Sequence, residues 1–480
     1  YVVRDYFDVF DEVYCPKEHT FEFLQNVLTE VMELFPSHYI HIGGDECPKK
    51  AWKKCAHCQH LMKWEGLPNE EALQSWFIHR IEQFVNSKGR DIIGWDEILE
   101  GGLAPNATVM SWRGEKGGIE AAHQRHKVIM TPGKKCYLDY YQESPEFAPL
   151  AIGGFLPLDT VYNYKPLPAE LTPEEQAYII GVQANIWGEY IQTPEYFEYM
   201  AFPRLLAMSE VQWTQPEHKD FESFARRLDK EFERLDYCGV NACRNFYEVN
   251  QAGAWNKSQQ TYEVTLNTFC PDADIYYAVN DSTVNTSSSL YKTPIPLDED
   301  ATVYSAVYRD GKPLGKVTRK SFAVNKATGC DYTCNPAAGW EHLNEGFGLT
   351  DGRRGYARDM RRWISFYQDT VQIVVELKKP QKVKEVAFSS LWRPVNEIWP
   401  ARAMSVSVSM DGQTFIPVGT KRLTYDFSLT EGTRFPASLS FAETEATFVR
   451  LELLSGGLCP KGYFHEGLQS ELAIDEIEIY

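Results

Sequence analysis

The chain has 480 residues, and at roughly 150 residues per domain its length predicts about three domains. Hydrophobic residues make up 43% and charged residues 24% of the sequence, a globular composition that excludes intrinsic disorder. The formal net charge of −19 would repel a phosphate backbone, so nucleic acid is not an expected partner.

The first half of the chain alternates helix-like with strand-like patterns. Apolar residues at helical spacing predict a helix over 22–35, and the short run Tyr39-Ile-His-Ile-Gly-Gly-Asp45-Glu46 predicts a strand that ends in acid. Further expected elements are a helix over 73–86, strands over 91–97, 108–112, 128–131 (running on to 137–139) and 181–189, and closing helices over 196–208 and 221–235. Strands that alternate with helices predict a parallel sheet.

Each strand-like run ends in Trp, Tyr, Asp or Glu instead of a plain turn. In a (β/α)₈ barrel the C-terminal strand ends and the loops after them build the active site. Five such ends are present, whereas a barrel has eight. Residues 1–249 are therefore predicted to be the C-terminal portion of a (β/α)₈ TIM-type barrel, about strands 4–8. We expect the units missing upstream to be needed for activity.

The helical pattern stops near residue 249 and period-two alternation takes over. Residues 250–326 are predicted to form a small β-sandwich module, with Tyr262-Glu-Val-Thr-Leu among its strands. Residues 327–480 are predicted to form a second β-sandwich with aromatic loops. The expected fold class is thus multidomain, α/β followed by all-β.

The pair Asp45-Glu46 is the sharpest chemical signal. Neighbouring strand residues point to opposite faces, so two adjacent carboxylates converge on a ligand only where the strand ends and the chain turns. Glycoside hydrolysis uses carboxylic acids as proton donors, and a nearby like charge helps to raise the acid's pKa. An acidic surface loop is the plain alternative, but Gly43-Gly44 directly before the pair permits close approach of the backbone to a ligand.

The chain has eleven Cys, an odd number that excludes complete internal pairing. Cys55-Ala-His-Cys58, with Cys47 before it and His57 and His60 nearby, can form a disulfide, stay as free thiols or bind zinc. Zinc is the less favoured interpretation because no second CxxC completes a tetrahedral set, so no metal ligand is assigned. Cys330 and Cys334 are close enough in sequence to bridge.

His41-Ile-Gly-Gly-Asp45-Glu46 resembles the signature of family 20 glycoside hydrolases, the β-N-acetylhexosaminidases. The resemblance continues in order through four further blocks: Gly94-Trp95-Asp96-Glu97, Ser111-Trp112-Arg113-Gly114, Tyr137-Leu-Asp139 and Gln183-Ala-Asn-Ile-Trp187-Gly-Glu189. It implies a substrate-assisted retaining mechanism in which the 2-acetamido oxygen of the substrate attacks the anomeric carbon and forms an oxazolinium intermediate. No cofactor is required.

The resemblance also implies residue roles. Glu46 would be the general acid and base, Asp45 would hold the acetamide N–H, and Tyr137 would donate to the acetamide oxygen. Trp95, Trp112 and Trp187 would wall the acetamide pocket, and Asp139 and Glu189 would bind outer hydroxyls. His41 is expected to be a buried structural or supporting residue. Arg113 and Asp96 are expected to be scaffold. An arginine that the family uses to clamp the terminal sugar would lie before Tyr1.

The tail carries weaker resemblances. Ile275-Tyr-Tyr-Ala-Val-Asn-Asp281 is similar to the small β-module that follows the barrel in bacterial hexosaminidases. Gly348-Leu-Thr-Asp351-Gly352 resembles a discoidin-like galactose-binding sandwich, a fold that often holds a structural calcium ion. The loop aromatics are expected to pack in the core in preference to binding glycan: Trp392, Trp399 and Phe464.

The leading interpretation is an exo-acting β-N-acetylhexosaminidase of bacterial type that removes terminal GlcNAc or GalNAc. Its location is expected to be extracytoplasmic (periplasmic, secreted or surface-anchored), and no transmembrane segment is expected because no stretch of about 18 uncharged apolar residues occurs. A non-catalytic, lectin-like glycan-binding protein and a lacto-N-biosidase-like relative are the alternatives. The choice between GlcNAc and GalNAc, the linkage and the oligomeric state stay open.

Overall fold

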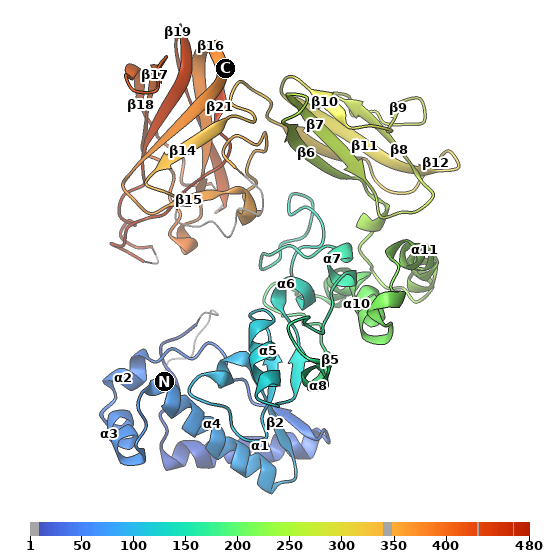
Figure 1. Cartoon of the computed structure of the whole chain (residues 1–480), viewed down its shortest axis with the longest axis vertical. Helices are drawn as coiled ribbons and strands as arrows, with labels where there is room; N and C mark the ends of the chain where they lie inside the picture. The colour runs from blue at the N-terminus through green and yellow to red at the C-terminus, as the bar shows by residue number, and fades with distance from the viewer. Residues whose placement is uncertain (1–8, 339–347, 430–431, 464) are drawn as a thin grey trace. The chain divides into compact units, whose positions relative to one another are not determined.

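The computed structural model describes residues 9–338, 348–429, 432–463 and 465–480. The chain divides into two compact units, which Figure 1 colours mainly blue to green and yellow to red. The first unit holds Tyr1–Gln142, Phe155–Phe224 and Val240–Ala242, and the second holds Glu143–Gly154, Ala225–Gly239 and Cys243–Tyr480. No helix in the described part of the chain combines the length and the apolar character that crossing a membrane requires.

The first unit is built on a five-stranded sheet whose strands follow one another in chain order and are all parallel. The strands are β1 (Tyr39–His41), β2 (Asp91–Trp95), β3 (Thr108–Ser111), β4 (Val128–Met130) and β5 (Ile179–Val182). This parallel sheet is the one that the alternating pattern predicts. Because the strands are parallel, their C-terminal ends lie along one edge of the sheet.

Alternate residues of these strands face opposite sides of the sheet. The helix-covered face carries fully buried residues such as Ile92, Val109 and Val128, and on it α4 (Glu70–Ser87) packs on β2 while α5 (Lys116–His123) packs on β3 and β4. The approach of α5 is close, since a Cβ on Gly118 would lie 2.6 Å from Sδ of Met130. Continuous apolar residues on this face therefore fix which side of the sheet the helices cover.

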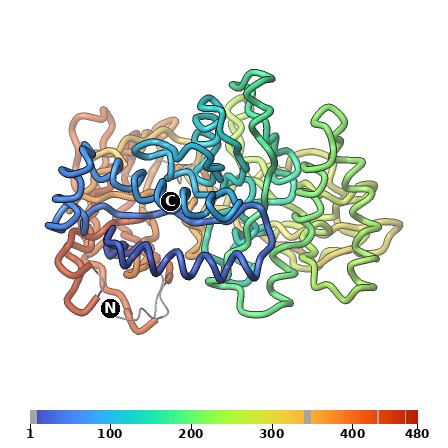
Figure 2. Tube along the Cα trace, turned by 90° about the horizontal axis from the view of Figure 1, so that it is seen from below, coloured from blue at the N-terminus to red at the C-terminus, as the bar shows by residue number. Residues whose placement is uncertain are grey.

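The helices agree with the sequence patterns at most positions. Helix α1 spans Glu18–Leu34 and appears in dark blue as one uninterrupted helix in Figure 2. Helix α4 begins after Asn69, whose side chain accepts a hydrogen bond from the N–H of Ala72. The single helix expected over 196–208 is instead two helices, α9 (Pro194–Ala201) and α10 (Arg204–Trp213), because Pro203 has no N–H to continue the ladder. The last predicted helix is α11 (Phe221–Tyr237).

The second unit is mainly β-structure. A three-stranded sheet (β10-β7-β6) and a sheet of β12-β11-β8-β9, with β13 on β11, are followed by an eight-stranded sheet. Two long strands, β16 (Thr370–Trp392) and β19 (Thr433–Leu454), run antiparallel through that last sheet. The remaining bounds are β6 (Asn250–Asn256), β7 (Thr261–Asn267), β8 (Asp274–Val279), β9 (Ser289–Leu290), β10 (Ile295–Leu297), β11 (Ala301–Arg309), β12 (Lys312–Pro313), β13 (Thr318–Phe322), β14 (Asp331–Asn335), β15 (Ile364–Phe366), β17 (Ala403–Ser409), β18 (Ile416–Arg422), β20 (Leu472–Ile474) and β21 (Glu478–Ile479).

Two tryptophans expected in the loops of this unit lie in its interior. Trp392 and Trp399 are both buried and pack with Phe435 in one cluster. Neither indole is therefore an exposed platform for a sugar. Phe464 lies outside the described residues.

One buried arginine ties the first unit together. Arg204, the first residue of α10, is fully buried and its guanidinium donates hydrogen bonds to four backbone carbonyls. The acceptors are the carbonyl oxygens of Leu138, Tyr140, Leu156 and Met200. A guanidinium has the planar array of donors that such a set requires, so Arg204 fixes the backbone of the loop after β4.

Replacing Arg204 by Met should destabilise this loop strongly, because buried carbonyls would lose their donors. We expect a loss of about 3–5 kcal/mol in the local free energy of opening. Hydrogen exchange of the peptides spanning 128–142 and 179–189 measures it. Lys63→Met removes an exposed charge from the same unit and should shift exchange by less than about 0.5 kcal/mol. Equal exchange in the two variants would show that Arg204 does not hold the loop.

Candidate active site

Four aromatic side chains gather at the C-terminal edge of the sheet. Trp95 ends β2, Trp112 directly follows β3, Tyr137 follows the short helix α6 (Gly133–Cys136) after β4, and Trp187 lies beyond β5. The ring of Trp95 is 5.9 Å from that of Trp187 and 6.5 Å from that of Trp112. The ring of Tyr137 lies 6.3 Å from both Trp112 and Trp187. The structure thus brings four of the predicted site residues into one aromatic cluster.

Two buried carboxylates fix the Trp112 corner of this cluster. Oδ2 of Asp96 accepts the backbone N–H groups of Trp112 and Arg113, at 3.0 and 3.2 Å. Oε2 of Glu97 accepts the indole N–H of Trp112 at 2.9 Å. Burial raises the pKa of Glu97, and the Trp112 hydrogen bond acts against that shift. Asp96 therefore acts on the backbone, and Glu97 sets the orientation of the indole, a role that the sequence did not assign.

Tyr137 is held by the neighbouring strand end. Tyr137 and Asn185 form a parallel bridge, in which Leu138 N–H donates to the Asn185 carbonyl at 2.7 Å and Asn185 N–H donates to Cys136 at 2.9 Å. Burial raises the pKa of Tyr137, against the hydrogen bonds of the Asn185 and Trp187 side chains. The phenol is therefore protonated at neutral pH and able to donate. Asn185 was missed from the sequence, although it stands two residues before Trp187 in the same sequence block.

Asp139 is a buried carboxylate held without hydrogen-bond partners. Only 4% of its surface is exposed, and neither carboxylate oxygen meets a donor in good geometry among the described residues. Burial raises its pKa to about 6, the charge of Glu189 adds to this shift, and that of Arg204 opposes it. Glu189 itself is exposed. The two predicted hydroxyl-binding carboxylates therefore lie close enough to interact electrostatically.

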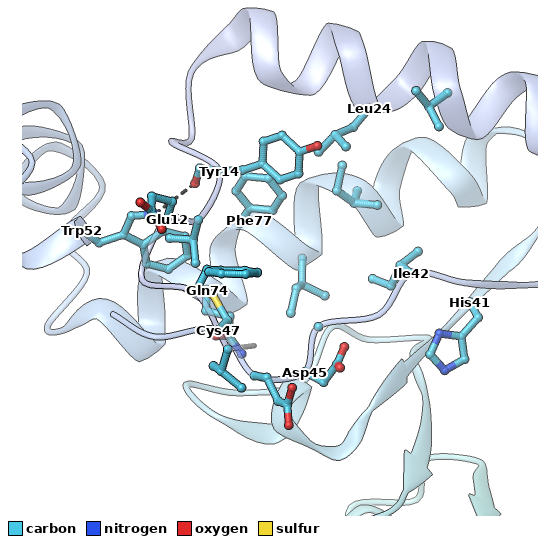
Figure 3. Close-up of a pocket in the computed structure, with 18 of the residues that line it drawn as sticks. Glu12, Tyr14, Leu24, His41, Ile42, Asp45, Cys47, Trp52, Gln74 and Phe77 are labelled. Atoms are coloured by element: carbon cyan, nitrogen blue, oxygen red, sulfur yellow. Dashed lines mark hydrogen bonds between the residues drawn. The ribbon is translucent and has the colours of Figure 1, made fainter. Parts of the chain in front are cut away.

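Asp45 and Glu46 lie on the loop after β1. Gly43 and Gly44 have φ of 74° and 96°, and a Cβ on Gly44 would come within 2.7 Å of Ile98. This combination of backbone conformation and close approach requires glycine. The same backbone extends the pairing of β1 with β2, because the N–H of Trp95 donates to the Gly43 carbonyl at 2.9 Å. Both acidic side chains are exposed and line a cavity of about 830 Å³, in which Figure 3 shows Asp45 beside Cys47 and opposite Phe77.

His41 is not buried, contrary to the sequence prediction. It lies on the edge strand β1, on the sheet face that lines an open cavity of about 680 Å³. Its ring packs edge-on against Trp95 at 4.8 Å, and its Nδ1 accepts the Gly43 N–H at 3.1 Å. Loss of solvent around the ring lowers the pKa of His41, and Asp45 opposes that shift. His41 lines the cavities of both the acidic loop and Trp187, and so links them.

The cysteines are grouped differently from the sequence prediction. None of the eleven forms a disulfide, Cys330 and Cys334 included. Cys47 does not join Cys55 and Cys58, because its side chain faces the cavity of the acidic loop. Cys15 takes its place beside them. A residue before the first helix carries no local signal of this proximity.

Two family models and several known proteins are similar to this chain. Residues 2–216 match glycosyl hydrolase family 20, catalytic domain, and residues 250–318 match the chitobiase/beta-hexosaminidase C-terminal domain. A beta-hexosaminidase of Porphyromonas gingivalis is 54% identical over 232 residues, covering 48% of this chain and 30% of that protein. One of Vibrio furnissii is 37% identical over 195 residues, covering 40% of this chain and 32% of that protein.

Among solved structures, the GH20 exo beta-N-acetylglucosaminidase of Vibrio harveyi in complex with N-acetylglucosamine is similar to this chain at 34% identity, with a TM-score of 0.42. The match covers 47% of this chain and 36% of that one. The chain thus spans about a third of the length of the curated relatives that it matches.

A parallel sheet with an aromatic and acidic C-terminal edge, together with these matches, defines a catalytic domain of the glycoside hydrolase class, followed by a C-terminal β-rich domain. Residues 2–216 are thus similar to the catalytic domain of glycosyl hydrolase family 20.

The raised pKa of Asp139 makes stability depend on pH. The folded state binds the proton more tightly than the unfolded chain does, so the free energy of unfolding falls as pH rises from the ordinary value of 3.8 to about 6. The free energy of unfolding of Asp139→Asn, relative to that of the native chain, should therefore rise by up to about 3 kcal/mol between pH 4 and pH 7. Denaturant unfolding across this range measures the difference, and Glu174→Gln, at an exposed position, should show no such trend. A flat difference for Asp139→Asn would contradict the assigned pKa.

Proposed function

We propose that this chain carries the site of an exo-acting, retaining β-N-acetylhexosaminidase that removes terminal GlcNAc or GalNAc from glycans. The observation that carries the proposal is the cluster of three Trp rings and Tyr137 at the strand ends, with Asp45-Glu46 at the same edge of the sheet. An aromatic wall packs against a pyranose and its acetamide group and excludes water from a reactive intermediate. The names of the family 20 relatives support the same activity.

The proposed chemistry is assisted by the substrate. The 2-acetamido oxygen attacks the anomeric carbon as the glycosidic C–O bond breaks, and Glu46 gives its proton to the leaving oxygen. Water then attacks the anomeric carbon of the oxazolinium intermediate, and Glu46 takes the proton from that water. Because both substitutions invert the carbon, the product retains the β configuration.

The acetamide is held from two sides in this proposal. Asp45 accepts the acetamide N–H and stabilises the positive charge that develops on it. Tyr137 donates its hydroxyl to the acetamide oxygen, a role supported by the burial that keeps the phenol protonated. Asn185, bridged to Tyr137 through the backbone, and Trp187, whose ring lies 6.3 Å from that of Tyr137, would position that hydroxyl.

In this proposal Asp139 and Glu189 bind the outer hydroxyls of the sugar. Neither buried oxygen of Asp139 accepts a hydrogen bond in good geometry among the described residues, although backbone N–H groups of Asp139 and Trp187 lie near them, and a hydroxyl of the substrate would supply such a bond. Bound substrate would also stabilise the charged form of Asp139, whose pKa of about 6 lies within the range of ordinary assays.

The surrounding architecture is proposed in the same way. We infer that the five strands are part of a (β/α)₈ barrel, since they are parallel, sequential and covered by helices on one face. The eight-stranded sheet is proposed to be a discoidin-like sandwich. A calcium ion there would suit the half-buried Asp351 and the fully buried Glu476, because burial and then the charge of Asp351 raise the pKa of Glu476. An extracytoplasmic location fits a glycan substrate.

Glu46→Gln should abolish general acid catalysis but spare the binding of the sugar. We expect hydrolysis of aryl β-GlcNAc and β-GalNAc to fall by about 10²–10⁴-fold for poor leaving groups. The loss should be smaller for 2,4-dinitrophenyl glycosides, whose leaving group needs no proton. The assay uses residues 1–480 and the longest natural polypeptide that contains them.

Glu65→Gln, which changes an exposed carboxyl at the end of the second helix after the loop, is the matched control and should keep full activity. A GlcNAc-thiazoline should inhibit the native protein, because it mimics the oxazolinium intermediate. If the longer polypeptide binds glycan but cleaves neither substrate, the enzymatic proposal fails and a lectin-like role replaces it.

A further inference from the structure

Three thiols from two separate segments meet outside the aromatic site. Cys15 lies in the segment before α1, and Cys55 and Cys58 lie at the start of α3 (Ala56–Glu65), which follows α2 (Lys50–Lys54). The Sγ of Cys15 is 3.9 Å from that of Cys55 and 3.8 Å from that of Cys58, and all three Sγ atoms lie within 4.8 Å of one another. Among the described residues these are the only potential ligands grouped so tightly.

The separations fit thiolates that share one metal ion. A disulfide requires an S–S distance of about 2.0 Å, and only one pair among three cysteines could form it. Zinc binds thiolates at about 2.3 Å in a tetrahedral arrangement, which places any two sulfurs about 3.8 Å apart. The observed Sγ–Sγ distances of 3.9 Å (Cys15 to Cys55) and 3.8 Å (Cys15 to Cys58) match that sulfur–sulfur separation.

The position of Cys15 is fixed by contacts on both of its neighbours. The indole N–H of Trp52, in α2, donates to the carbonyl of Tyr14 at 3.0 Å, as Figure 3 shows. Nε2 of His57, in α3, donates to the carbonyl of Pro16 at 3.3 Å. These bonds hold the segment against the two helices whatever the state of the thiols, so the ligands are pre-organised.

One of the three sulfurs meets backbone donors. The backbone N–H groups of Cys58 and His57 are directed at Cys55 Sγ, the arrangement that stabilises sulfur carrying negative charge. Cys58 is fully buried and packs with Trp52, Met62 and Leu73. A group of three soft ligands favours zinc over hard cations such as Mg²⁺ or Ca²⁺.

We propose that Cys15, Cys55 and Cys58 bind one Zn²⁺ ion, with water in the fourth position. Three Zn–S bonds form, the three thiol protons pass to solvent, and no electron is transferred. The ion fastens the segment before α1 to the α2–α3 pair, which directly follows the Asp45-Glu46 loop. Its role is structural, and it is independent of the proposed glycosidase chemistry.

The test is metal analysis of the native chain. After equilibration with Zn²⁺ and removal of excess, elemental analysis should find about one zinc per chain, and replacement by Co²⁺ should give thiolate-to-cobalt charge-transfer absorption. A chelator should speed hydrogen exchange in residues 9–17 and 50–65. This last measurement needs no variant, so it stands even where a substitution impairs folding.

Cys15→Ser, Cys55→Ser and Cys58→Ser should each reduce bound zinc by more than about tenfold, as expected for loss of one of three ligands. Cys47→Ser and Cys238→Ser remove thiols outside the group and should leave the stoichiometry unchanged. The proposal is overturned if the native chain retains less than about 0.1 zinc per chain. It is also overturned if Cys15→Ser binds as much zinc as the native chain, or if peptide mapping finds a disulfide within the group.

Discussion

The parallel register of β1–β5 is the constraint on which the site depends. Because all five strands run the same way and pair in chain order, residues separated by up to about 150 positions meet at one edge. Trp95 and Trp187 contact each other only for this reason. The same register gives the sheet two unlike faces. One is apolar and covered by helices. The other carries His41 and Trp95 and lines an open cavity.

The C-terminal edge of the sheet is held in place by buried polar side chains that hydrogen-bond mainly to backbone groups. Arg204 donates to the carbonyls of Leu138 and Tyr140, on either side of Asp139. Asp96 accepts the N–H groups of the turn after β3, and Glu97 orients the Trp112 ring. Asp96 and Arg204 each have several hydrogen-bond partners, which is the condition under which a buried charge is tolerated. Asp139 stands apart from them, since its oxygens are buried without donors and its pKa rises accordingly.

The Asp45-Glu46 loop is held by contacts on both of its sides. Gly43 and Gly44 allow its backbone to pass close to Ile98 and to pair with Trp95, which aligns the loop with β2. Beyond it, the α2–α3 pair is joined to the segment before α1 through Tyr14, Pro16 and the three thiols. The catalytic carboxylates of the proposal are thus carried by a loop that is anchored at both ends, as a reaction sensitive to geometry requires.

The sequence by itself determined the order of the elements, the parallel sheet and the blocks that carry the acidic and aromatic residues. These depend on local periodicity and on which residues end each strand, and both can be read along the chain. The tertiary structure alone decided which residues meet. Cys15 replaces Cys47 beside Cys55 and Cys58, His41 lies open on an edge strand, and Asn185 and Glu97 support Tyr137 and Trp112. Such contacts join residues far apart in the chain or depend on what covers a face, and no local pattern specifies either.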